Sequence, residues 1–365
     1  MPAIISGTFF MKEEQVRLES KCLPVGSLPY NDEKLATQMM VRLFEDIPYL
    51  PIVPVISATD TIISRTINNL PWFSIKNKKI IIKDGSEKFN QDMIILDKAY
   101  NEPTQDIIEA YKIESPFLTK FLQILNRIKP KTAVVNLLGP FTISQMISKA
   151  ECPQILIDKL YRKVVIQSVC VKALWIANKI KEVSPETTPL IIFEEPMLHK
   201  FGCMKRSTEE LTNDIIENMY SKVFQKLHQN GCLVGVQCFE KCDWQLVLSS
   251  GVDLISFDAY NNPNNIGIIA DKINSYLAAG GYINWGIVPV KTEALIKSLT
   301  IDNLQNRFKK TVEGIANQGV NINLLYRRSL VSIQGNIDKL PIIFAEKALI
   351  LSTQLAKKIP LTAQQ

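Results

Sequence analysis

The chain has 365 residues, of which 46% are hydrophobic and 21% are charged, a balance typical of a globular protein with a sizeable core. Its formal net charge is +6 and its lysines are dispersed along the sequence, so we expect no nucleic-acid partner. No apolar run approaches the roughly 20 residues that span a bilayer, so we expect no membrane partner.

Short apolar runs alternate with longer helical patterns along the chain. Most of these runs are almost continuously apolar, as a strand covered on both faces requires. The predicted strands are residues 21–27, 49–56, 132–138, 189–194, 233–238, 253–258, 282–287 and 328–333.

Helical patterns separate the predicted strands. They are clearest at residues 155–181, 208–229, 265–279, 301–318 and 341–357. Strands that alternate with helices in this way predict an α/β fold, namely a single (β/α)8 TIM barrel over residues 1–365, rather than an open doubly wound sheet.

The connection between the second and third predicted strands, residues 57–131, is too long for a simple crossover. It contains a predicted hairpin near residues 78–85 and a predicted helix near residues 115–127. Long insertions usually cover or line a binding face, so we expect this insertion between strands 2 and 3 to do so.

The cysteines and the N-terminal residues indicate the cellular compartment in which the protein is expected. The seven cysteines are odd in number and form no CxxC pair, which favours reduced thiols over disulfides. Met1–Gly7 lacks the basic and apolar regions of a signal peptide. We therefore expect a cytoplasmic protein. Its only histidines are His199 and His228, so little imidazole is present for catalysis or metal binding.

Functional side chains of a TIM barrel follow the strands, at the carboxyl-terminal mouth. Nearly every predicted strand here ends in glycine, proline, a carboxylate or a carboxamide, which is more polarity than a structural rim needs. The segments at these strand ends are Gly26–Pro29, Pro54-Val55, Gly139–Thr142, Glu194–Pro196, Gln237–Phe239, Asp258–Tyr260, Trp285–Pro289 and Gln334–Asn336.

Several of these segments resemble the C-terminal catalytic barrel of cobalamin-independent methionine synthases, most closely their short relatives without the N-terminal barrel. The resemblance implies a methyltransferase of the homocysteine or related thiol type, acting in methionine biosynthesis, with a folate or a corrinoid protein as methyl donor. The segments that carry it, in the family's order, are Gly26-Ser-Leu-Pro29, Leu138-Gly-Pro-Phe-Thr142, Phe193-Glu-Glu-Pro196, Ser256-Phe-Asp-Ala-Tyr260 and Asn284-Trp-Gly-Ile-Val-Pro289.

In that family a zinc ion binds the substrate thiol and lowers its pKa, so that the thiolate attacks the methyl group. The resemblance places the zinc ligands at Gln237, Phe239, Asp258 and Gln334, where the family has His, Cys, Glu and Cys. Carboxamides are poor zinc donors and phenylalanine is none, so a degenerate zinc site is expected. Asp258, Gln237 and Gln334 would surround the reacting atom as the catalytic residues.

The resemblance also implies a small-molecule substrate site. Ser27 matches the position that holds an amino-acid carboxylate, and Glu194 matches the acid that binds the amino group. Tyr260 and Trp285 are the other predicted substrate-binding residues, and Trp285 could stack on a flat donor. A rigid turn at Ser27, and a Glu194-Glu195 pair satisfied by backbone N–H groups, are the structural alternatives.

A rebuilt metal site is a separate hypothesis. His199, Cys203, Cys238, Cys242 and Asp258 follow three successive predicted strands and could face one mouth. Thiolates with one imidazole hold zinc tetrahedrally. Against this, Cys238-x3-Cys242 is not a diagnostic spacing, and free cysteines are usually buried and inert.

Two function classes follow for the whole chain. The first is a methionine-synthase-like methyltransferase that acts on a small amino acid or thiol. The second is a non-catalytic ligand-binding or regulatory protein on the same barrel, favoured by the joint loss of zinc ligands. A metal-free decarboxylase of the uroporphyrinogen type ranks last, because its arginine-rich N-terminal loop is not visible.

Overall fold

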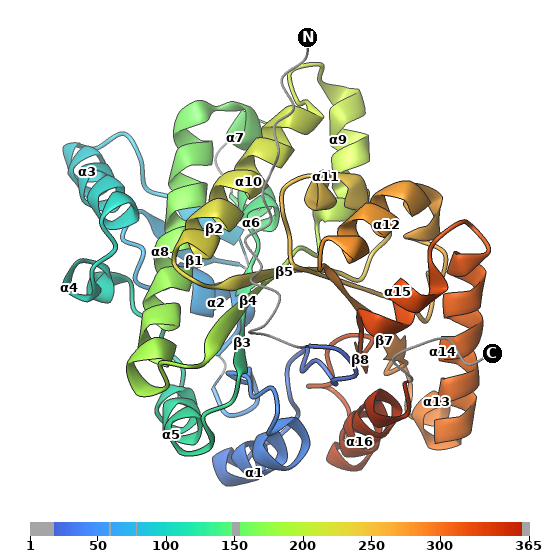
Figure 1. Ribbon diagram of the computed structural model, residues 1–365. Helices are drawn as coiled ribbons and strands as arrows, with labels where there is room; N and C mark the ends of the chain where they lie inside the picture. Colours follow the sequence, from blue (N-terminus) through green and yellow to red (C-terminus); the bar gives the residue numbers. More distant parts are fainter. Residues whose placement is uncertain (1–17, 58–59, 78, 148–153, 360–365) are drawn as a thin grey trace.

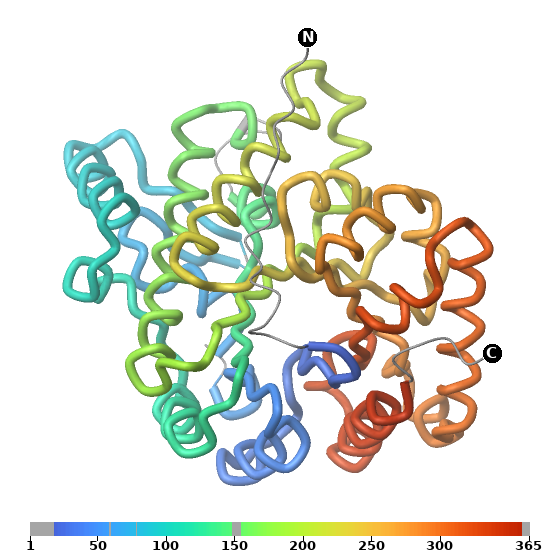
Figure 2. Tube along the Cα trace, viewed as in Figure 1, coloured from blue at the N-terminus to red at the C-terminus, as the bar shows by residue number. Residues whose placement is uncertain are grey.

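The computed structural model describes residues 18–57, 60–77, 79–147 and 154–359. Two of the expectations above involve residues outside these ranges. The absence of a signal peptide was inferred from Met1–Gly7, and the predicted hairpin includes Lys78. Helices surround a curled central sheet, which the ribbon and the Cα trace show from the same side (Figures 1 and 2).

Six strands form one parallel sheet in which each strand pairs with the next along the chain. All six coincide with predicted strands, and their residues are almost all buried, as expected for a sheet covered on both faces. The strands are β3 (Thr132–Leu138), β4 (Thr188–Glu194), β5 (Leu233–Cys238), β6 (Leu254–Phe257), β7 (Tyr282–Val288) and β8 (Ser329–Ile333).

The long helices lie around the outside of this sheet (Figure 1). They confirm the five predicted helical patterns, and α10 shows why: its buried residues, such as Ile216, Met219, Tyr220 and Val223, recur at the spacing of one helix face. These helices are α8 (Lys159–Val183), α10 (Asn213–Gln229), α12 (Ala270–Ala278), α14 (Ile301–Ala316) and α16 (Ile342–Lys358).

Shorter helices complete the connections between strands and helices. They are α1 (Glu33–Phe44), α6 (Pro140–Met146), α7 (Gln154–Ile157), η2 (Leu198–Lys200), α9 (Phe201–Ser207), α11 (Trp244–Leu248), η3 (Gly267–Ile269), α13 (Glu293–Ser298) and α15 (Ile322–Arg327). Among the helices that the structure describes, none is long and apolar enough to cross a membrane.

Residues 21–27 and 49–56, predicted as the first two strands of eight, are irregular segments rather than strands of the sheet. Each makes one isolated parallel bridge, Cys22 with Val331 of β8 and Tyr49 with Val134 of β3. Proline explains the difference, because Pro24, Pro51 and Pro54 interrupt the segments and have no N–H to donate to a ladder.

Backbone hydrogen bonds nevertheless hold both segments beside the sheet. The Leu23 N–H donates to the Val331 carbonyl at 2.9 Å, and the Leu50 N–H donates to the Val134 carbonyl at 3.0 Å. The two segments also join each other where the Leu28 N–H donates to the Ile52 carbonyl at 2.8 Å. The fold is thus an α/β fold with a curled, six-stranded parallel sheet.

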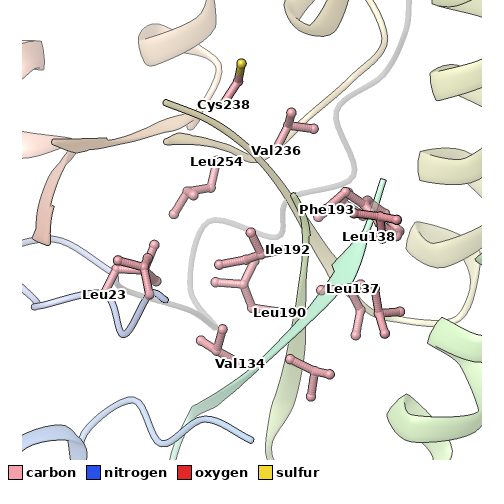
Figure 3. Packing of buried hydrophobic residues seen from close by; sticks show 14 of the residues in the cluster. Leu23, Val134, Leu137, Leu138, Leu190, Ile192, Phe193, Val236, Cys238 and Leu254 are labelled. Atoms are coloured by element: carbon pink, nitrogen blue, oxygen red, sulfur yellow. The ribbon is translucent and has the colours of Figure 1, made fainter. Parts of the chain in front are cut away.

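The two faces of the sheet bury different side chains. In β4, Leu190 and Ile192 point to one side and Phe193 to the other (Figure 3). Alternate residues of a strand face opposite ways, so Leu190 and Ile192 pack inside the curl near Leu254 of β6. Phe193 faces the helices, where its ring stacks on Phe224 of α10 with the centroids 6.4 Å apart.

The insertion between residue 57 and β3 packs against α8 on the outside of the sheet (Figure 1). Its antiparallel hairpin lies slightly earlier than predicted, and α5 confirms the helix predicted near residues 115–127, whereas α3 was not predicted. Its elements are α2 (Ile62–Ile67), β1 (Phe73–Lys76), β2 (Lys79–Ile82), α3 (Glu87–Asn101), α4 (Gln105–Ile108), η1 (Glu109–Tyr111) and α5 (Leu118–Ile128).

Two buried polar contacts dock this insertion onto α8. The Trp72 Nε1 donates to the Ser168 Oγ at 3.0 Å. The Lys172 ammonium donates to the Lys112 carbonyl at 3.0 Å and to the Asn68 carbonyl, and burial lowers the pKa of Lys172 to about 7. A cavity of about 490 Å³ lies beside this junction.

A buried ion pair fixes the proline-rich segment 49–56. The Arg65 and Asp60 side chains are both fully buried, with Nη2 3.6 Å from Oδ1. The Arg65 guanidinium donates to the carbonyls of Leu50 at 2.9 Å and Pro51 at 2.6 Å, and Asp60 Oδ2 accepts from the Val53 N–H at 2.9 Å. Side chains therefore supply the hydrogen bonds that a regular ladder would have made.

We expect Arg65→Met to lower the free energy of unfolding by about 3–5 kcal/mol, because it leaves the Asp60 carboxylate buried without its cation. Urea unfolding followed by circular dichroism measures the change. Arg127→Met, on the exposed side of α5, is the matched control and should change it by less than about 0.5 kcal/mol. Equal unfolding midpoints for the two variants would contradict this role of Arg65.

Candidate functional site

Polar side chains form a row across four neighbouring strands. The register pairs Glu194 of β4 with Gln237 of β5, Gln237 with Ser256 of β6, and Ser256 with Asn284 of β7. Paired residues of parallel strands point to the same face, and Glu194 shares its face with Ile192. The polar row, Glu194, Gln237, Ser256 and Asn284, therefore lies inside the curl, towards the carboxyl ends of the strands.

Glu194 is the carboxylate of the polar row. The Asn136 Nδ2 of β3 donates to its Oε1 at 2.8 Å. Burial raises the pKa of Glu194, while the Asn136 hydrogen bond and the positive charge of Arg65 act in the opposite direction. The Arg65 guanidinium donates its hydrogen bonds to backbone carbonyls. Glu194 can therefore still accept a hydrogen bond from a donor in the mouth.

Three buried acceptors around the row have no hydrogen-bond donor among the described residues, namely Asn136 Oδ1, Gln237 Oε1 and Asn284 Oδ1. The three residues are at most 5% exposed. The Asn284 Nδ2 donates to Ser256 Oγ and to Ser332 Oγ, each at 2.8 Å, which fixes the orientation of this side chain. An unsatisfied buried acceptor costs roughly 1–3 kcal/mol, so this cluster is suited to receive N–H or O–H donors.

Asp258 and Gln334 form a hydrogen-bonded clamp beside the row. The Gln334 Nε2 donates to Asp258 Oδ2 at 2.7 Å. Asn261 supplies two further donors to Asp258, its N–H to Oδ1 at 2.8 Å and its Nδ2 to Oδ2 at 2.7 Å. Amides thus satisfy both oxygens of this carboxylate.

Phe239 lies against the same clamp. A Cβ added at Gly286 would lie 3.1 Å from the Phe239 ring and 3.5 Å from the Gln334 Cα. The structure therefore brings Phe239, Gln334 and Asp258 together, as the resemblance implied. These residues do not fit a zinc ion of that family, because a phenyl ring occupies one ligand position and Asp258 is already satisfied by amides.

The hypothesis of a rebuilt metal site is not supported. Within the described part of the chain, no group of three or more His, Cys, Asp or Glu side chains is arranged to hold a metal ion. His199 Nδ1 pairs with the Pro196 carbonyl at 2.8 Å, and exposed Cys203 contacts Arg206. Burial and the neighbouring Cys238 raise the pKa of the Cys242 thiol, which keeps it protonated.

Glu195 has a structural role that differs from that of Glu194. It is fully buried on the helix-facing side of β4, where Tyr220 of α10 donates to it at 2.8 Å. It also accepts from the N–H groups of Phe141 and Thr142 and from the Thr142 hydroxyl. The alternative of a carboxylate satisfied by backbone N–H groups is therefore confirmed for Glu195 and not for Glu194.

Ser27 lies at the mouth but is engaged by another loop. Its N–H and its hydroxyl both donate to Asn336 Oδ1, at 3.0 and 3.2 Å. Gly26 has a positive φ of 79°, and a Cβ there would lie 2.6 Å from the Gly335 carbonyl, so glycine is required at this contact. A ligand carboxylate can reach the Ser27 donors only if Asn336 turns away.

Trp285 does not lie where a substrate-binding role requires, whereas the substrate-binding role of Tyr260 stays a prediction. Trp285 is fully buried on the helix-facing side of β7, where its Nε1 donates to Ser329 Oγ at 2.7 Å and its ring meets Phe308 of α14. Stacking of Trp285 on a donor in the mouth is therefore ruled out by its orientation. The Tyr260 ring is covered by the guanidinium of Arg307, 3.8 Å away, at the rim.

Several residues of the site were not predicted, among them Ser256 and Asn284 of the polar row, Asn136 and Arg65. Asn136 lies within an otherwise apolar run, Thr132–Leu138, and this single carboxamide was the available signal. Arg65 lies in the insertion, and no spacing in the sequence connects it with Glu194.

Comparison with known proteins supports the fold. No protein-family model matches the chain, and no curated protein matches it. Among solved structures, a B12-independent methionine synthase from Shewanella sp. W3-18-1, in complex with selenomethionine, is similar over 93% of this chain and 97% of its own. The TM-score is 0.52 at 11% sequence identity, so the chain shares a methionine-synthase-like fold.

We expect protein purified without chelator to contain substoichiometric zinc, because the residues at the family's ligand positions do not fit the metal. Elemental mass spectrometry measures the metal content. Cys238→Ser should leave the measured content unchanged. One equivalent of zinc that disappears in Cys238→Ser would overturn this expectation.

Glu195 should make stability depend on pH. Burial raises its pKa from 4.5 to about 7 in the folded state. Between these values the folded chain keeps a proton that the unfolded chain releases, so the stability present below pH 4.5 is lost as the pH rises through 7. Relative to Glu195→Gln, the free energy of unfolding of the wild type should fall by roughly 3 kcal/mol across this range.

Urea unfolding at a series of pH values tests this expectation. Glu182→Gln, at a side chain that is 63% exposed, is the control and should run parallel to the wild type. Parallel profiles for Glu195→Gln and the wild type would show that folding does not raise the pKa of Glu195.

Proposed function

We propose that this chain binds a small amino acid inside the mouth of the curled sheet, with Glu194 holding the ammonium group of the ligand. The observation that carries the proposal is the partly buried Glu194 carboxylate, beside buried acceptors of Asn136 and Gln237 that have no donor among the described residues. A buried carboxylate is stable when a charge-assisted donor compensates it, and an ammonium group is such a donor.

The best-supported function is ligand binding without zinc-thiolate chemistry. The positions that would hold zinc carry a phenyl ring, two carboxamides and a carboxylate satisfied by amides. A methyltransferase that uses a folate or a corrinoid donor is the second candidate, and the fold similarity to a methionine synthase favours it. Conversion of homocysteine to methionine with a methylated folate or corrinoid, followed by mass spectrometry, would move the assignment to this enzyme.

We also propose that residues 21–27 and 49–56 take the places of the first two strands of an eight-membered (β/α)8 barrel. Their hydrogen bonds to β8, to β3 and to each other support this arrangement. In such a barrel the loop at Ser27 and Asn336 would border the ligand. Rotation of Asn336 would then expose the Ser27 N–H and hydroxyl to the ligand carboxylate.

We expect Glu194→Gln to weaken amino-acid binding about 10- to 100-fold, because a neutral amide replaces a charge-assisted acceptor. The glutamine oxygen can still accept from Asn136, so the fold should be retained. Isothermal titration calorimetry with a panel of L-amino acids measures the affinity. Glu209→Gln, at an exposed position, should leave the affinity unchanged.

The affinity should also depend on pH with a defined sign. Burial raises the pKa of Glu194 above its ordinary value, and only the ionised form pairs with an ammonium group. Binding should therefore weaken on acidification, and the dependence should disappear in Glu194→Gln. Equal affinities of the wild type and Glu194→Gln at neutral pH would contradict the proposed role.

A further inference from the structure

We infer that the ligand is an amino acid whose side chain ends in a neutral N–H donor, a carboxamide or ureido group, which Gln237 selects over a thiol or thioether. This inference rests on the proposed function and specifies its substrate class. It concerns the end of the ligand's side chain, away from the ammonium group that Glu194 would hold.

Gln237 is the specificity-determining residue because it combines burial with an unsatisfied acceptor. It is 5% exposed, and its Oε1 has no donor among the residues that the structure describes. It is paired in register with Glu194 on the adjacent strand, and neighbouring strands lie about 4.8 Å apart. A ligand bound at Glu194 by one end therefore reaches Gln237 within a short side chain.

The remaining groups around Gln237 favour a donor that carries no charge. The Asn284 Oδ1, two strands further along the polar row, is a second acceptor that has no donor among the described residues. Asp258, the nearby carboxylate, is already compensated by the amides of Gln334 and Asn261. An NH₂ group donates hydrogen bonds without carrying a charge, which matches a neutral acceptor such as Gln237 Oε1.

A thiol or thioether matches these groups poorly. Sulfur is a weak hydrogen-bond donor in a thiol and only an acceptor in a thioether, so Gln237 Oε1 would stay unsatisfied beside it. A site built to hydrogen-bond a ligand rejects the analogue that lacks the partner group, because its own buried polar atoms are then unpaired. Methionine and homocysteine are such analogues of glutamine, with a similar side-chain length.

Calorimetric titration of the full chain with glutamine, citrulline, methionine, homocysteine and arginine tests the inference. Glutamine or citrulline should bind at least about tenfold more tightly than methionine and homocysteine, and citrulline more tightly than arginine. Gln237→Met should remove this preference, because it weakens binding of the amide ligands and removes the acceptor that the sulfur ligands leave unsatisfied. Gln225→Met, at an exposed position of α10, is the matched control and should keep it.

The outcomes separate this inference from the proposal on which it rests. Binding of amino acids without a preference for the amide ligands, or with a preference for the sulfur ligands or for arginine, overturns the inference and leaves the proposed function standing. Absence of binding by every amino acid overturns both. Because the wild-type panel decides the preference by itself, the test does not depend on the folding of Gln237→Met.

Discussion

The fold and the site both depend on one buried guanidinium. Arg65 compensates the Asp60 carboxylate and donates to the Leu50 and Pro51 carbonyls, so it holds a proline-rich segment against the sheet. Its charge also acts on Glu194, opposing the rise in pKa that burial causes. A neutral residue at this position would therefore loosen the segment and make the site carboxylate harder to ionise. The insertion that carries Arg65 contributes to the site through this charge.

The apolar strand patterns predicted the sheet well in segments without internal proline, where every backbone N–H can donate to a neighbouring strand. Thr132–Leu138 and Leu233–Cys238 are apolar runs without internal proline, and the structure gives them the predicted bounds. The segments 21–27 and 49–56 are equally apolar, but Pro24, Pro51 and Pro54 remove donors, and only isolated bridges remain. The apolar pattern predicted their burial, and the proline positions decided their hydrogen bonding.

Strand ends predicted Glu194, Gln237, Asp258 and Gln334 because parallel strands bring their carboxyl ends to one edge. The same reasoning failed for Trp285, since the end of a strand still has two faces. Trp285 lies between Asn284 and Gly286, which face the inside of the curl, so alternation alone places its ring among the helices. Arg65 could not be predicted, because tertiary contacts alone bring it to Glu194, whereas the carboxamide of Asn136 within an apolar strand was a signal that was missed.

The clamp around Asp258 limits how this mouth could acquire a metal. Gln334 donates to Asp258 from the position that would need a thiolate, so Gln334→Cys alone removes a donor from the carboxylate without completing a zinc site. Phe239→Cys alone would replace a ring packed beside Gly286 by a smaller thiol that has no imidazole or carboxylate free to join it. Each of these single substitutions thus weakens the mouth before several together could bind zinc. The hydrogen bonds among the amides make the metal-free arrangement stable in itself, which is consistent with a site that recognises its ligand through hydrogen bonds.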